Sequence, residues 1–140
     1  MSFLLDTNVV SELARARPNV KVIAWLGSVP STDLFLSVIT LGEIRRGIET
    51  KRTTTAHDAA RLEAWLATLV LRYRSRILLF DQESADRWGR IMALHPTMPV
   101  EDGQLAATAL QHRLTFATRN VRHILRTGVS FVDPFETRRA

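Results

Sequence analysis

The sequence predicts one α/β domain over residues 1–140, with a central, mostly parallel sheet of about five strands and helices on both faces. Short apolar runs alternate with stretches of helical periodicity along the whole chain, which is the pattern of strands joined by crossover helices. The connections between these elements are short, and no repeat or low-complexity segment interrupts them. A chain of this length buries roughly two-thirds of its unfolded surface, so it needs no disulfide to fold.

The first half of the chain predicts two strands and four helices. Pro18 and Pro30 end the first two helices, because proline cannot continue a helix. The fourth helix has the strongest periodic signal, and its apolar stripe is either core packing or a partly exposed surface for a partner helix. The stripe consists of Leu62, Trp65, Leu66 and Leu69. The expected strands are 3–5 and 34–38, and the expected helices are 9–16, 20–29, 40–51 and 56–73.

The second half predicts three more strands and three more helices. Residues 96–99 include Pro96 and Pro99 and are expected to separate two helices. Gly128 is expected to turn the chain into a last edge strand before Pro134, and the polar tail 136–140 is expected to be loose. The expected strands are 77–80, 114–118 and 129–132, and the expected helices are 84–95, 102–113 and 121–126.

Polar residues follow the predicted strands where the apolar runs stop. Asp6 comes directly after the first strand, Glu43 follows the second, and Asp102 opens a helix after Pro99-Val100. Asn120 follows the fourth run. Because the carboxyl ends of parallel strands share one edge of the sheet, we expect these side chains to converge. Carboxylates without cysteine make a hard oxygen site, which suits Mg²⁺ or Mn²⁺ better than Zn²⁺.

Each acid also has a purely structural explanation. Asp6 can cap the first helix, Glu43 can form a capping box with Thr40, and Asp102 is favoured by the helix dipole in a first turn. Their shared position at one sheet edge favours the site over three separate caps. Small residues on the last long helix let it lie close to the sheet and bring Asp102 to that edge. These are Ala106, Ala107 and Ala109.

The histidines and tryptophans show no such convergence. The histidines have no repeating ligand spacing, and we expect surface or packing roles for them. The tryptophans lie at core spacing on helices and are expected to be packing anchors. The histidines are His57, His95, His112 and His123, and the tryptophans are Trp25, Trp65 and Trp88.

The chain is strongly basic. It has 19 Lys and Arg residues against 14 Asp and Glu residues, a net charge of +5 and a pI near 10.9, which is typical of nucleic-acid binders. Any one arginine cluster can instead be a solvated helix face. An aspartate at position 6 comes too early for a signal peptide, and no apolar stretch approaches the length of a membrane span. We therefore expect a cytoplasmic protein without membrane contact.

Four segments resemble, in the same order and spacing, motifs of the PIN-domain family, and within it the VapC-type toxins of type II toxin–antitoxin operons, in the branch that includes FitB. They are LLDTNVVSEL, SVITLGEIRRGIE, MPVEDGQLAATAL and FATRNVRHI. The resemblance runs from Phe3 to Phe135. It implies a PIN-like three-layer fold and a metal-dependent ribonuclease held inactive by a cognate VapB-type antitoxin. A homodimer is also expected.

The resemblance implies roles for individual residues. Asp6, Glu43 and Asp102 match the acids that bind the metal, and Asn120 matches a fourth position that is aspartate in many members. The amide adds no charge, so the site has three formal negatives. Many members also have aspartate and phenylalanine where this chain has His123 and Ile124, and there we expect a changed local cap with no lost chemistry.

The expected mechanism is hydrolysis of an RNA phosphodiester by a metal-activated water. Asp6 and Asp102 hold the ion directly, and Glu43 binds it through water or acts as the base. Asn120 positions ligands or the nucleophile together with Thr7 and Thr118. Three arginines near the acids are expected to contact flanking phosphates: Arg45, Arg46 and Arg119.

Two alternatives remain open from the sequence. A non-catalytic basic module that binds RNA or pairs with an antitoxin is favoured by Asn120, which replaces an acid. An aspartyl-phosphate phosphatase also has an aspartate after its first strand. That reading is weakened because Asn8 stands where a second acid is expected and no lysine follows Leu78.

Overall fold

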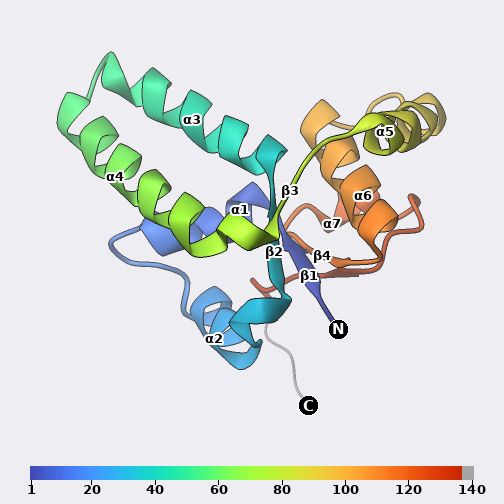
Figure 1. Cartoon of the computed structure of the whole chain (residues 1–140), viewed down its shortest axis with the longest axis horizontal. Coiled ribbons are helices and arrows are strands. Elements are labelled where there is room, and N and C mark those ends of the chain that lie inside the picture. The colour runs from blue at the N-terminus through green and yellow to red at the C-terminus, as the bar shows by residue number, and fades with distance from the viewer. Residues whose placement is uncertain (137–140) are drawn as a thin grey trace.

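The computed structural model describes residues 1–136 and contains one parallel sheet with the strand order β3-β2-β1-β4-β5 (Figure 1). Every pairing is parallel, which confirms the predicted α/β class and makes the sheet fully rather than mostly parallel. The strands are β1 (Phe3–Leu5), β2 (Leu34–Ser37), β3 (Ile77–Leu78), β4 (Thr115–Ala117) and β5 (Phe131–Val132).

Helices cover both faces of this sheet. The longer ones are α2 (Val20–Ser28), α3 (Val38–Arg52), α4 (Ala56–Tyr73), α5 (Gln82–Leu94) and α6 (Val100–His112). The short ones are α1 (Thr7–Val10) and α7 (Val121–Ile124), with 3₁₀ turns at Ser11–Ala14, Ser31–Asp33 and Arg74–Arg76. In Figure 1, α3 and α4 form one arm of a V and α5 and α6 form the other, with the sheet at its base. Among the described residues, no helix combines the length and apolar character needed to cross a bilayer.

The fold has two hydrophobic cores, one on each face of the sheet, and therefore three layers of helices, sheet and helices. Successive strand residues point to opposite faces, so Leu5 and Ala117 join the core under α1 to α4, whereas Leu4 and Phe116 join the core under α5 to α7. Strands buried on both faces read as continuous apolar runs, which is why the sequence shows no polar alternation within them.

Several boundaries differ from the sequence expectation because local caps set them. The third helix begins at Val38 instead of 40, since the Ser37 hydroxyl accepts a hydrogen bond from the Ile39 amide at 3.0 Å. The fifth begins at Gln82 instead of 84, since the Asp81 carboxylate accepts from the Ser84 amide at 2.9 Å. The helix expected at 9–16 begins at Thr7 and tightens into a 3₁₀ turn from Ser11.

Four strands are shorter than expected, β2 and β4 by one or two residues at their ends and β3 and β5 by two. β3 ends at Leu78 because this residue pairs with Ser37, the last residue of β2, and no partner backbone extends further. β5 covers only Phe131–Val132 of the expected 129–132. The short helix expected at 121–126 ends at Ile124. The tail expected to be loose lies, beyond Glu136, outside the described residues.

The apolar stripe of α4 is mainly core. Leu66 and Leu69 are buried, while Leu62 and Trp65 are partly buried and pack against the same core. The reading of the stripe as an exposed partner surface is therefore wrong for Leu66 and Leu69.

The predicted close approach of α6 is confirmed. Ala106, Ala107 and Ala109 are fully buried against the sheet. On the side facing α5, a Cβ added at Gly103 would lie 2.6 Å from the sulfur of Met92. The first turn of α6 is therefore fixed tightly relative to the sheet edge.

Candidate active site

The predicted polar residues gather at the carboxyl edge of the sheet, between the two arms of the V (Figure 1). Leu5 and Ala117 are register partners at the ends of β1 and β4, so the residues that follow them are neighbours. The Asp6 amide donates to the Ala117 carbonyl at 2.9 Å and extends this pairing by one step. The sheet thus places Asp6 beside Thr118, although they are far apart in sequence.

Asp6 is both a helix cap and a member of the site. Only 4% of its surface is exposed. Its Oδ1 accepts a hydrogen bond from the Thr7 amide at 2.7 Å, and its Oδ2 accepts one from the Thr118 hydroxyl at 2.6 Å. Burial raises the pKa of Asp6 to about 6, and the charges of Asp102 and Glu43 add to this effect while the two hydrogen bonds oppose it.

Glu43 is not part of a capping box. Ser37 caps α3, which leaves Glu43 inside the helix with its side chain turned towards α1. Its Oε1 accepts a hydrogen bond from the Thr7 hydroxyl at 2.5 Å. Burial raises its pKa, and the charges of Glu101 and Asp102 raise it further.

Asp102 lies in the first turn of α6 and is buried. Its Oδ2 contacts the Nδ1 atom of His123 from α7. The expectation that His123 has only a surface or packing role is therefore wrong, because its ring contacts a proposed site acid. The expectation of no lost chemistry at this position stays a prediction. The sequence offered one indication of the contact, since His123 directly follows the TRN-x-R segment, at a position where many PIN domains have an acid.

Thr118 directly follows β4, and its hydroxyl makes hydrogen bonds with Asp6 and Asn120. Its buried hydroxyl donates to Asp6 and accepts a hydrogen bond from the Asn120 amide at 2.9 Å. Asn120 directly precedes α7 and is partly buried, and its contact with this network is made by its backbone amide. The structure thus brings both expected threonines into direct contact with an acid, Thr7 with Glu43 and Thr118 with Asp6.

The three arginines differ in what they contact. Arg45 binds Glu49 at 2.9 Å and Glu63 at 2.7 Å, so its guanidinium joins α3 to α4. The guanidinium of Arg119 lies over the ring of Phe135, 4.3 Å from its centroid. The side chain of Arg46 is 74% exposed and lies 3.7 Å from Glu101. Of the three, Arg46 lies beside the acids with the fewest competing contacts.

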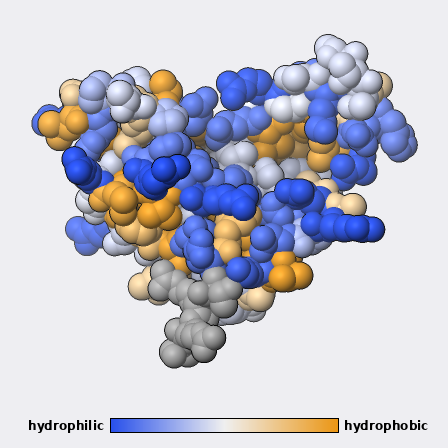
Figure 2. Space-filling view, turned by 180° about the vertical axis from the view of Figure 1, so that it is seen from behind, coloured by the Kyte–Doolittle hydropathy of each residue, from blue (hydrophilic) through white to orange (hydrophobic). Residues whose placement is uncertain are grey.

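A shallow cleft of about 260 Å³ lies between α3 and α6 and is bordered by Glu43, Arg46 and Glu101. Figure 2 shows, from behind, that the outline of the molecule dips between its two arms and that hydrophilic side chains border the dip. A polar ligand can therefore approach the acids from solvent.

The donor set suits a hard divalent cation. Asp6, Glu43 and Asp102 supply carboxylate oxygens, no thiolate is present, and the charge of Asp102 raises the pKa of both other acids. Within residues 1–136, no three Asp, Glu, His or Cys side chains already surround one position closely enough to hold an ion. Thr118, Thr7 and His123 hold oxygens of these acids, so an ion would have to compete for them.

Comparison with known proteins supports the resemblance. The PIN domain family model matches residues 3–128. Toxin FitB of Neisseria gonorrhoeae is 39% identical over 140 residues, covering 94% of this chain and 97% of the relative. VapC ribonuclease Y4jK of Sinorhizobium fredii is 33% identical over 141 residues, covering 95% and 97%.

Solved structures agree with this result. In the crystal structure of FitAcB from Neisseria gonorrhoeae, one chain matches with a TM-score of 0.88 and 35% identity, covering 96% of this chain and 99% of that one. The chain belongs to the PIN-domain family.

Proposed function

We propose that this protein is the toxin of a VapBC-type toxin–antitoxin pair and that it hydrolyses RNA with the help of Mg²⁺ or Mn²⁺. The observation that carries the proposal is the gathering of three acids from β1, α3 and α6 at one edge of the sheet. Relatives matched over nearly their whole length are named as a toxin and as a ribonuclease, which supports the same conclusion.

Each acid has a role that follows from its surroundings. Asp6 and Asp102 are buried and are the candidates to hold the ion directly, whereas Glu43 faces the cleft and is the candidate to bind through water or to act as base. When bound, the ion lowers the pKa of a water molecule and offsets charge on the phosphate.

The neighbouring polar groups orient these acids. Thr118 fixes one oxygen of Asp6 and Thr7 fixes one oxygen of Glu43. The backbone amide of Asn120 donates to the Thr118 hydroxyl, and its uncharged side chain is the candidate to position a ligand or the attacking water. Arg46 and Arg119 are the candidates to hold neighbouring phosphates, and the ion pairs of Arg45 leave it less available.

The partner expected for such a toxin is a VapB-type antitoxin. The groove beside Leu62 and Trp65 has a volume of about 310 Å³ and reaches Thr7 and Glu43. An antitoxin segment in this groove would cover the approach to the acids, which is a direct way to hold the enzyme inactive.

A ribonuclease assay tests the function. The wild-type protein is expected to cut structured RNA with Mg²⁺ or Mn²⁺ and to stop in EDTA. Asp102→Asn is expected to lower the rate by about 100-fold or more with an unchanged circular dichroism spectrum, because it removes a candidate metal ligand. Asp86→Asn changes the same charge on the exposed surface of α5 and is the matched control.

The outcome separates the alternatives. A rate for Asp102→Asn within a few-fold of wild type would exclude the proposed role of this acid. Binding of RNA without any cutting would favour the non-catalytic module to which Asn120 points. The phosphatase reading is not favoured, because the chain belongs to the PIN-domain family.

A further inference from the structure

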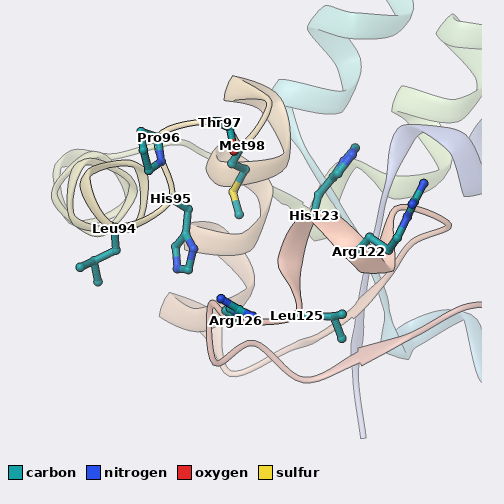
Figure 3. Close-up of a pocket in the computed structure, with 9 residues that line it drawn as sticks. All are labelled: Leu94, His95, Pro96, Thr97, Met98, Arg122, His123, Leu125 and Arg126. Carbon is teal, nitrogen blue, oxygen red and sulfur yellow. The ribbon is translucent and has the colours of Figure 1, made fainter.

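A further cavity, of about 530 Å³, is lined in part by His123, the residue that contacts Asp102. One wall comes from the end of α5 and the loop after it, and the other comes from α7 and the turn after it (Figure 3). The lining includes four basic residues and two leucines: His95, Arg122, His123 and Arg126, together with Leu94 and Leu125.

The lining of this cavity carries positive charge without compensation. It contains Arg122 and Arg126 and no aspartate or glutamate. Within residues 1–136, neither arginine takes part in a salt bridge, whereas Arg45 and Arg52 on α3 each bind two glutamates. Unpaired guanidinium groups on a concave surface attract anions and bind phosphate with two parallel hydrogen bonds.

His123 joins the cavity to the proposed active site. Its Nδ1 contacts Asp102, and the same residue lines the cavity. In Figure 3, the side chains of His123 and Arg122 run in the same direction, away from His95, while Arg126 points towards His95. A strand that leaves the acids therefore meets these basic side chains next.

The cavity also has an apolar rim. The side chains of Leu94 and Leu125 belong to opposite walls and are unusually exposed for leucine, at 79% and 57%. The walls behind them are anchored, because Met98 and Ile124 are buried in the core under α6. A rigid pocket with basic side chains and an apolar rim suits a group that has both a phosphate and a flat ring.

We propose that this cavity is an RNA subsite that binds the phosphate and base of a nucleotide next to the scissile phosphodiester. Arg126 contacts the phosphate of this nucleotide, Arg122 contacts the neighbouring phosphate on the side of His123, and the leucines contact the base or ribose. The proposal rests on the ribonuclease function above. The cavity volume lies within the range of about 300–1,000 Å³ that is typical of ligand pockets, which is room for a nucleotide rather than a long segment.

Equilibrium binding in EDTA tests the subsite without cleavage. A labelled single-stranded RNA is titrated with wild type, with Arg122→Gln/Arg126→Gln and with Arg72→Gln/Arg74→Gln. The last pair changes the same net charge at the end of α4, outside the cavity. If each cavity arginine contacts a phosphate, the slope of log K against log salt should fall by about 1.4, since each contact to a single strand contributes about 0.7.

The cavity pair should also bind about 10-fold more weakly at low salt, while the α4 pair should change little. Arg122→Lys/Arg126→Lys, which keeps both charges, should restore most of the slope. Circular dichroism and the melting temperature of each variant check that these exposed substitutions leave the fold intact.

Equal binding by the two glutamine pairs, with wild type still cutting RNA in Mg²⁺, would overturn the subsite and leave the proposed function standing. A cavity pair that binds RNA normally but loses its antitoxin would assign the cavity to a protein partner and would also overturn the proposal. A wild-type protein that neither binds nor cuts RNA would overturn both proposals.

Discussion

At the scale of single residues, a structural role and a chemical role coexist in the same side chain. Asp6 uses Oδ1 to cap α1, as a structural reading of the sequence predicts, and offers Oδ2 to the site. Asp102 occupies a first helical turn and also faces two other acids. An acid that caps a helix is therefore no evidence against a metal site when the helix begins at the carboxyl edge of a sheet.

The raised pKa of Asp6 predicts how stability depends on pH. The folded state favours the protonated carboxyl, so this contribution is fully present below about pH 4 and is lost as pH rises through about 6. The loss amounts to about 3 kcal/mol at neutral pH, because one pKa unit corresponds to about 1.4 kcal/mol. Asp6→Asn cannot ionise, and its amide oxygen still accepts from the Thr7 amide.

Urea unfolding in EDTA at pH 4.5 and pH 7.5 measures this effect. Asp6→Asn should gain about 2 kcal/mol relative to wild type between the two pH values, because part of the effect is already lost at pH 4.5. A difference between the two proteins that does not change with pH would show that burial does not perturb this carboxyl.

Sequence reasoning predicted some single residues well and others poorly. Asp6 was predictable because it directly follows β1 at the carboxyl edge of a parallel sheet, whereas the places of Glu43 and Asp102 also depend on how α3 and α6 pack. The contact of His123 with Asp102 was not, because it depends on how α7 packs against the start of α6. The ion pair of Arg45 was not predictable either, because α4 supplies Glu63, a partner that no local pattern on α3 reveals.

At the scale of elements, the order and type were predictable, and the ends were not. Short apolar runs predicted all five strands, and the signal is clearest for β1, which is buried on both faces. Strand lengths depend on where the neighbouring strand stops, as β3 shows against β2. The first residue of a helix depends on one capping side chain, such as Ser37 for α3 or Asp81 for α5. The spacing of apolar residues along the helix does not reveal this position.

The tight contact between α5 and α6 gives a prediction at this scale. A methyl group at Gly103 would meet Met92 at 2.6 Å and Trp88 at 3.2 Å, so Gly103→Ala should destabilise the fold by about 1–3 kcal/mol. It should also lower RNA cleavage, because Asp102 is the preceding residue. Gly89→Ala on α5 is the control, since its methyl meets nothing within 4 Å and should stabilise by up to about 1 kcal/mol.

Chemical denaturation of Gly103→Ala and Gly89→Ala measures the two free energies of unfolding that this prediction compares. Equal stability of the two variants would contradict the prediction. It would mean that α5 and α6 move apart at little cost in free energy and that α6 does not hold Asp102 rigidly.

At the scale of the whole molecule, charge is divided between two regions. Three acids lie between the arms, while the protein as a whole has a net charge of +5. This division suits a polyanionic substrate, because the positive surface attracts RNA and the acids retain a cation at the point of reaction. The expected homodimer stays a prediction, which sedimentation velocity checks.

The central claim is that Asp6, Glu43 and Asp102 form a divalent metal centre, and the melting temperature in increasing Mg²⁺ tests it most directly. An ion that binds only the folded protein at 100 times its Kd adds about 2.7 kcal/mol, or roughly 5–10 °C for a domain of this size. Wild type and the control Asp86→Asn should rise by this amount, while Asp6→Asn and Asp102→Asn should stay nearly constant. A wild-type melting temperature that ignores Mg²⁺ and Mn²⁺, or an equal rise in all four proteins, would contradict the claim.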